Sequence, residues 1–148
     1  MRAVTKIILI LCLILTVINV SYAFDDSRKV LEVELHDYGW ESDMATLDGY
    51  SNQLLNESNS TGYIIIYGAR HGRRGEAEKR MKCMKSYLIE RRGIHPDRIK
   101  VSHGGYRERS MMELWIVPHG GKAPTPTRTV KPKGVRLRKG KIRYSCDV

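Results

Sequence analysis

Two histidines in this sequence have neighbours suited to phosphoryl transfer. His71 follows an apolar run and lies between Arg70 and Gly72, and His103 lies in the similar context VSHGG, residues 101–105. A reaction through phosphohistidine needs one imidazole as nucleophile, with arginines and a second imidazole around the phosphoryl oxygens. His71 with Arg70 and Arg74 could supply the first part, and His103 the second. The two motifs therefore predict a small phosphatase as one alternative.

The sequence around these histidines argues against that alternative. The motifs are similar to those of the histidine phosphatases, a family whose domain begins with the first motif and has several helices before the second. Here a strand and a helix are predicted before His71, and one helix separates it from His103. Glu76 is a first-turn residue of that helix and not an evident proton donor. We therefore expect no enzymatic activity and interpret both histidines as loop residues.

The periodicity of the mature chain predicts an α+β two-layer sandwich with the element order β-α-β-α-β-β. A period of two indicates half-buried strands, an unbroken apolar run indicates a central strand buried on both faces, and a period of 3.6 indicates helices. Ser42 or Asp43 is expected to cap the first helix. The predicted strands cover residues 30–35, 63–68, 97–102 and 111–118, and the predicted helices cover residues 41–57 and 75–92.

Part of this pattern resembles the OmpA-like domain, the peptidoglycan-associating module of Gram-negative envelope proteins. The strand YIIIYG, the helix KRMKCMKSYLIERRGI and the segment HPDRIKVSHGGYRE are similar to a strand, a helix and a strand with its loop in that family. The resemblance covers residues 63–108. It implies the fold of that family for residues 24–118, and a place in the periplasm or at the outer membrane of a Gram-negative bacterium.

The same resemblance implies a ligand site near the start of the second helix. In that family an aspartate before the helix and an arginine on it clamp the diaminopimelate group of peptidoglycan, carboxylate against ammonium and guanidinium against carboxylate. The arginine corresponds to Arg80, whereas His71 takes the place of the aspartate. We expect a degenerate site that binds peptidoglycan or another anionic envelope polymer. The expected ligand-binding residues are Arg70, His71, Arg73, Arg74 and Arg80.

The number of cations at this place also favours an anionic ligand. Five lie within eleven residues, near a predicted helix N-terminus, and such helix ends attract anions. A solvated loop neutralised by nearby glutamates is the alternative. The sequence has no glycine-rich phosphate loop, no Cys-x-x-Cys pair and no metal-ligand spacing, so we expect neither cofactor nor metal. The five cations are Arg70, Arg73, Arg74, Lys79 and Arg80.

Residues 1–23 have the composition of a secretory signal peptide. A basic start precedes an apolar run over residues 7–20, and Ser21 and Ala23 suit cleavage before Phe24. The run is short for a membrane span, so no integral span is expected after cleavage, with an uncleaved anchor as the alternative. Export also argues against nucleic acid as a partner.

Charge and cysteines set the C-terminal segment apart. Residues 24–121 hold 15 basic and 15 acidic residues, whereas residues 122–148 hold nine basic residues and one acidic residue, a net charge of +8. Proline, glycine and threonine predict a mobile linker and basic tail over residues 119–148, with an optional hairpin around Gly140. Cys83 and Cys146 can form a disulfide that pins this tail to the domain, and two free thiols are the alternative.

Together these patterns predict an exported, single-domain, non-catalytic module that binds in or supports the cell envelope. A histidine phosphatase is the first alternative. A secreted adaptor that binds through its basic tail is the second. The sequence leaves the ligand and the oligomeric state open.

Overall fold

The computed structural model describes residues 27–36 and 39–146, so the predicted signal peptide lies outside the described residues. Four strands form a mixed sheet: β1 (Arg28–Glu34), β2 (Ser60–Ala69), β3 (Ile99–Arg107) and β4 (Met111–Pro118). Their order in the sheet is β1-β4-β2-β3. β4 is antiparallel to both β1 and β2, whereas β2 and β3 are parallel. β2 is therefore a central strand, as its apolar run predicts.

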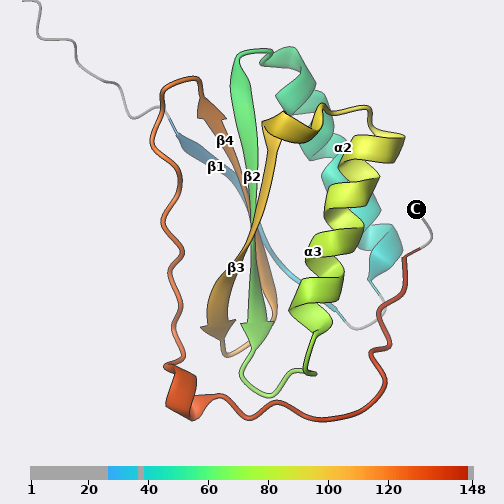
Figure 1. The fold of residues 1–148 in the computed structure, drawn as a ribbon, viewed down its shortest axis with the longest axis vertical. Coiled ribbons are helices and arrows are strands. Elements are labelled where there is room, and N and C mark those ends of the chain that lie inside the picture. The colour runs from blue at the N-terminus through green and yellow to red at the C-terminus, as the bar shows by residue number, and fades with distance from the viewer. Residues whose placement is uncertain (1–26, 37–38, 147–148) are drawn as a thin grey trace, which may run out of the picture.

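Two helices cover one face of this sheet (Figure 1). They are α2 (Trp40–Asn56) and α3 (Glu76–Ser86), and α3 continues into one π-helical turn, η1 (Tyr87–Arg91). Together with the sheet they form an α+β fold whose element order agrees with the predicted one. The connection from β2 through α3 to β3 joins the two parallel strands, so the β2–α3 loop starts at the carboxyl end of β2.

The core lies between the sheet and the two helices. Ile64 and Ile66 of β2 pack there with Leu47 of α2 and Met84 of α3, and each of these side chains is fully buried. Burying such a side chain contributes about 1.5–3 kcal/mol. Ile65 alternates to the opposite face of the sheet and is buried as well. Both faces of β2 are thus covered, which accounts for the unbroken apolar run.

The start of α2 differs from the prediction. The helix begins at Trp40, and Gly39 is its N-cap without a side-chain hydrogen bond. The predicted caps, Ser42 and Asp43, lie inside the first turn. Asp43 is buried, and its carboxylate accepts hydrogen bonds from residues outside the helix. The predicted cap was wrong because the tertiary partners of Asp43 take its oxygens.

The C-terminal segment wraps around the domain. In Figure 1 it runs from β4 past the sheet, below the carboxyl ends of β2 and β3, and up beside the helices. The backbone N–H of Val130 donates to the Tyr106 carbonyl (3.0 Å), and that of Arg136 donates to the Arg70 carbonyl (2.9 Å). The predicted disulfide is confirmed between Cys83 and Cys146. The segment is extended, as expected, but docked.

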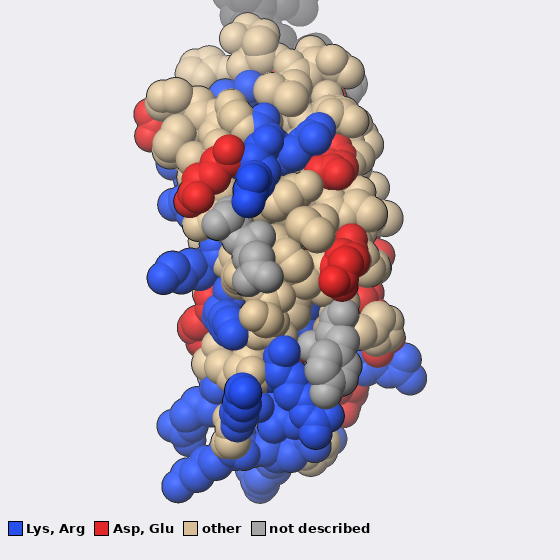
Figure 2. All heavy atoms as spheres, turned by 90° about the vertical axis from the view of Figure 1, so that its right-hand side faces the viewer, with Lys and Arg blue, Asp and Glu red and all other residues tan. Residues whose placement is uncertain are grey.

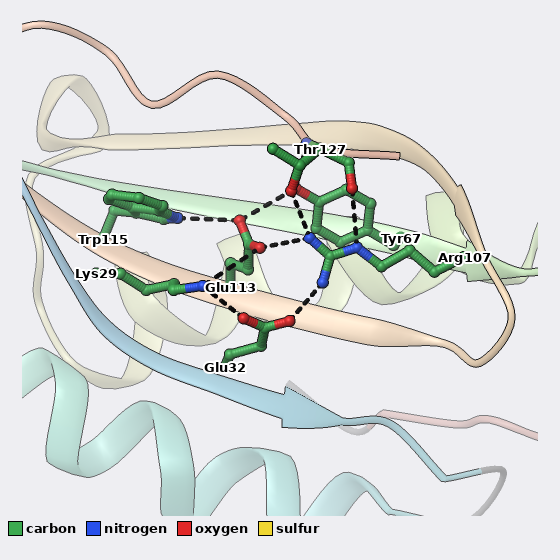
Figure 3. A network of polar contacts seen from close by, with 7 residues as sticks. All are labelled: Lys29, Glu32, Tyr67, Arg107, Glu113, Trp115 and Thr127. Atoms are coloured by element: carbon green, nitrogen blue, oxygen red, sulfur yellow. Dashed lines mark hydrogen bonds and ion pairs between the residues drawn. The ribbon is translucent and has the colours of Figure 1, made fainter. Parts of the chain in front are cut away.

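A polar network joins the beginning of this segment to the face of the sheet that the helices leave open (Figure 3). The Arg107 guanidinium lies 3.7 Å from the Tyr67 ring centroid and donates to Glu113 (2.6 Å) and to Thr127 Oγ1 (2.8 Å). The Thr127 N–H donates to the Tyr67 hydroxyl (3.0 Å). The tail therefore covers polar side chains of β2, β3 and β4 on this face.

The optional hairpin around Gly140 does not form, because Arg138 pairs with Arg73 of the β2–α3 loop instead.

Among the described residues, no helix has the length and apolar character needed to cross a bilayer.

Candidate functional site

A pocket with a volume of about 400 Å³ opens at the carboxyl ends of β2 and β3. Its walls come from the end of β1, the β2–α3 loop, the first turn of α3, the β3–β4 connection and the tail. The carboxyl ends of parallel strands are the usual place for ligand sites in α/β folds, because the connecting loops diverge there. This pocket is the candidate binding site.

The structure brings some of the predicted site residues into this pocket and leaves others outside. His71 and Arg73 line it, and so does His103. Arg70 lies beside it, where it donates to Glu108 (3.3 Å) and to the Gly134 carbonyl (3.2 Å). Two further predicted residues, Arg74 and Arg80, are not among the lining residues.

The β2–α3 loop owes its shape to short backbone contacts. The N–H of Gly72 donates to the Ala69 carbonyl (2.9 Å), and Gly75 adopts a left-handed conformation with φ of 78° directly before α3. Glycine is the residue that adopts this conformation without steric cost. The Arg138 N–H of the tail donates to the Gly72 carbonyl (2.9 Å), so the tail completes the pocket from outside.

Arg80 lies behind the pocket wall and is fully buried. It donates to Glu76 (3.0 Å) and to the carbonyl of His36 (2.6 Å), and both of these residues line the pocket. It also donates to Asp43 (3.2 Å) and lies 4.0 Å from the ring centroid of Tyr144. These contacts enclose Arg80 and leave it closed to a ligand in this structure. The assignment of Arg80 to a ligand stays a prediction, and in the structure its contacts are internal.

The Arg80 cluster has a fixed pattern of donors and acceptors. The Tyr144 hydroxyl donates to Asp43 Oδ2 (2.9 Å). Burial raises the pKa of Tyr144, and the nearby Asp43 carboxylate raises it further, so this hydroxyl keeps its proton. Burial also raises the pKa of Asp43, whereas the hydrogen bond from Tyr144 and the charge of Arg80 act in the opposite direction. The cluster is a structural support that fixes the end of β1 and the start of α3.

Most carboxylates around the pocket are already neutralised by cations of the chain. Glu34 pairs with Arg109 (2.9 Å), and Glu108 pairs with Arg70 (3.3 Å). Glu76 pairs with the buried Arg80 behind the wall. Of the four lining carboxylates only Glu78 forms no ion pair within the described chain.

The cations that remain leave the pocket with unused positive charge and unused donors. Arg73 and Arg138 line it and form no ion pair with any described residue. Arg73 Nε and His103 Nε2 are buried without a hydrogen-bond partner. Because His103 Nδ1 accepts from the Gly105 N–H (3.0 Å), a neutral His103 carries its proton on Nε2. Both unpartnered atoms are donors, so the pocket is suited to an anionic acceptor.

Several lining residues were not predicted from the sequence. Glu34 ends β1, His36 follows that strand, and Tyr106 lies at the end of β3. Leu137 and Arg138 come from the tail. The tail does carry a signal: its alternation of basic and apolar residues is typical of a chain with one side against a protein surface. No group of three residues able to hold a metal ion is found in the part of the chain that the structure describes.

Comparisons with protein-family models, curated proteins and solved structures found no match for this chain. Its function is therefore argued from the pocket.

Proposed function

We propose that this chain is an exported, non-catalytic, OmpA-like domain of the cell envelope that binds carboxylates of peptidoglycan in the pocket at the ends of β2 and β3. The observation that carries this proposal is the unused positive charge of Arg73 and Arg138 beside the unpartnered donor of His103. Charge-assisted hydrogen bonds to a carboxylate satisfy both the charge and the donors. The resemblance to the OmpA-like family favours peptidoglycan among anionic envelope polymers.

The pocket also offers one place for a positive group of the ligand. Glu78 lines the pocket, is exposed and forms no ion pair with the described residues. A stem peptide of peptidoglycan carries amino groups as well as carboxylates. We assign the ligand carboxylate to Arg73 and His103, and an ammonium group to Glu78, which takes over the role of the aspartate replaced by His71.

Two adjacent arginines allow a sharp test of this assignment. Arg73 lines the pocket, whereas its neighbour Arg74 does not, and each substitution by glutamine removes one positive charge. Sedimentation with purified peptidoglycan at high salt measures binding while exposed charges are screened. Arg73→Gln should weaken binding at least about tenfold, the value of one charge-assisted hydrogen bond, and Arg74→Gln should change it little. Equal losses in the two variants, or no binding by the unaltered protein, would overturn the proposal.

The phosphatase remains a second candidate because His71 and His103 line the same pocket. The binding proposal expects hydrolysis of a simple phosphomonoester to be no faster with the unaltered protein than with His71→Ala. A clear rate that is lost in both His71→Ala and His103→Ala would replace the binding function with catalysis.

A further inference from the structure

The β2–α3 loop and the tail form one continuous basic surface. The N–H of Arg138 bonds to the Gly72 carbonyl (2.9 Å), and the N–H of Arg74 bonds to the Arg138 carbonyl (3.2 Å), so the two segments run side by side. Figure 2 shows the result, a concentration of lysine and arginine side chains at one end of the molecule. Neither segment alone has this density of positive charge.

The cations of this surface are accessible and keep their charge uncompensated. Each has an exposed side chain, and none forms an ion pair within the described residues. Two glutamates of the adjoining pocket are engaged elsewhere, Glu76 with Arg80 and Glu108 with Arg70, and another, Glu78, forms no ion pair with these cations. The cations are Arg74, Arg136, Arg138, Lys139 and Lys141.

The fold holds these cations in place before any partner arrives. Ile142 packs against the core, Tyr144 is buried, and Cys146 is bonded to Cys83 of α3. Before them in the chain, the Arg136 N–H donates to the Arg70 carbonyl (2.9 Å) and the Arg138 N–H to the Gly72 carbonyl (2.9 Å), so the basic stretch is fixed to the domain at both of its ends. A partner therefore meets an ordered array, and ordering the tail adds no cost to binding.

We propose that this basic surface docks the protein onto a membrane of anionic lipids. Its cations are exposed and cover one end of the molecule (Figure 2), and all but Arg138 lie outside the pocket. This arrangement fits a plane of many separate phosphate groups. The two buried donors without a hydrogen-bond partner, which would suit one specific acceptor, belong to the neighbouring pocket and not to this surface. Each lysine or arginine near an anionic bilayer strengthens binding about fivefold.

The test compares two variants with the same net charge. The surface variant carries Arg74→Gln, Lys139→Gln and Lys141→Gln; none of these side chains lines the pocket. The control variant removes three exposed cations that lie toward the other end of the sheet, none of which forms an ion pair within the described residues. The control substitutions are Arg91→Gln, Lys100→Gln and Lys122→Gln.

Binding to vesicles is measured by sedimentation. One kind of vesicle contains equal parts of phosphatidylglycerol and phosphatidylcholine, and the other contains phosphatidylcholine alone. The unaltered protein should bind only the anionic vesicles, and high salt should release it. The surface variant should bind about a hundredfold more weakly, and the control variant less than about tenfold more weakly. Both variants should still bind peptidoglycan at high salt, which separates this test from that of the pocket.

Three outcomes would overturn the membrane proposal. Equal losses in the two variants would mean that net charge, and not this surface, attracts the protein. Binding to phosphatidylcholine alone would exclude an electrostatic surface. Binding to soluble polyphosphate without binding to anionic vesicles would make a polymer, and not a bilayer, the partner of this surface.

Discussion

Two arginine networks fix the tail to the domain, one on each side of the sheet. On the helix side, Arg80 lies over the ring of Tyr144 and pairs with Asp43. On the open side, Arg107 lies over the ring of Tyr67 and pairs with Glu113 (Figure 3). In each network the tail supplies a partner, the Tyr144 hydroxyl in the first and Thr127 in the second. The chemistry is the same, an arginine between an aromatic face and a carboxylate.

The two networks differ in their access to water. The Arg80 side chain is 0 % exposed and that of Asp43 6 %. The Arg107 side chain is 12 % exposed, and it pairs both with Glu113, which is 3 % exposed, and with Glu32, which is 33 % exposed. A buried ion that loses its partner cannot be solvated, but a partly exposed ion can turn to water. Because their exposure differs, we expect the two networks to contribute differently to the stability of the fold, although their contacts are of the same kind.

The largest expected effect is the loss of Asp43. In Asp43→Ala the buried Arg80 loses one of its two carboxylates, and the Tyr144 hydroxyl loses its acceptor. Leaving a buried charge without its partner costs about 3–5 kcal/mol. Urea unfolding, followed by circular dichroism, measures the free energy of unfolding.

Glu41→Ala is the matched control for Asp43→Ala. Both carboxylates lie in the first turn of α2, but Glu41 is exposed. Its loss should cost less than about 1 kcal/mol, the value of an exposed carboxylate at a helix N-terminus. Similar losses for the two variants would contradict the contrast between the networks. If Asp43→Ala does not fold, Asp43→Asn preserves the shape and still tests the loss of charge.

The disulfide gives the next largest effect. Cys83 and Cys146 are separated by 63 positions, and closing a loop of this length stabilises a protein by about 4 kcal/mol on the chain-entropy model. In the double variant Cys83→Ser, Cys146→Ser, the free energy of unfolding should fall by that amount. Hydrogen exchange should increase near residue 144 and stay unchanged near residue 127, because the bond fixes only the helix-side end of the tail. Equal increases at both places would contradict this separation.

The strands and helices were predictable because their signals are local. The unbroken run over residues 63–68 corresponds to β2, and the apolar stripe of Ala77, Met84 and Leu88 corresponds to the buried side of α3 and η1. The path of the tail was not predictable in the same way. Its partners lie far away in the sequence, and the contact between Tyr144 and Asp43 spans 101 positions. The composition of the tail indicated a mobile linker, whereas in the structure hydrogen bonds to distant residues dock the tail onto the domain.

The candidate site was predictable only in part, for a related reason. His71 and Arg73 lie in the β2–α3 loop, which the pattern of strand and helix places at the end of the sheet. The burial of Arg80 depends on Tyr144 and Asp43, which no local pattern connects to it. Likewise, β4 lies between β1 and β2 and is antiparallel to both, so β1 and β2 run in the same direction. Glu34, at the end of β1, therefore lines the pocket at the end of β2. Pairings between distant strands require the folded structure.

The smallest expected effect concerns the open network, the contacts of Arg107 on the side of the sheet that the helices leave open. It is measured as a change in the pH dependence of stability. The hydrogen bond from Lys29 lowers the pKa of Glu32 below its ordinary value of 4.5, and Arg107 acts in the same direction. The folded protein therefore binds fewer protons at Glu32 than the unfolded chain does. This contribution to stability is fully present above about pH 4.5 and is lost as the pH falls through the lower pKa of the folded protein.

Asp43 of the buried network titrates with the opposite sign. Burial raises its pKa above the ordinary value of 3.8, so its contribution to stability is present at low pH and is lost as the pH rises through the raised pKa.

Glu32→Gln isolates the open network, because it removes the titrating group and leaves Asp43 unchanged. At neutral pH the variant should be less stable than the unaltered protein by about 0.2–1 kcal/mol, the usual value of a partly exposed ion pair. Urea unfolding at a series of pH values should show this difference shrinking as the pH falls from about 4.5 to the lower pKa of the folded protein, because only the unfolded chain takes up a proton at Glu32 in that range. A difference that persists unchanged in acid would mean that Glu32 acts by packing and not by charge. The open network would then resemble the buried one more closely than its exposure suggests.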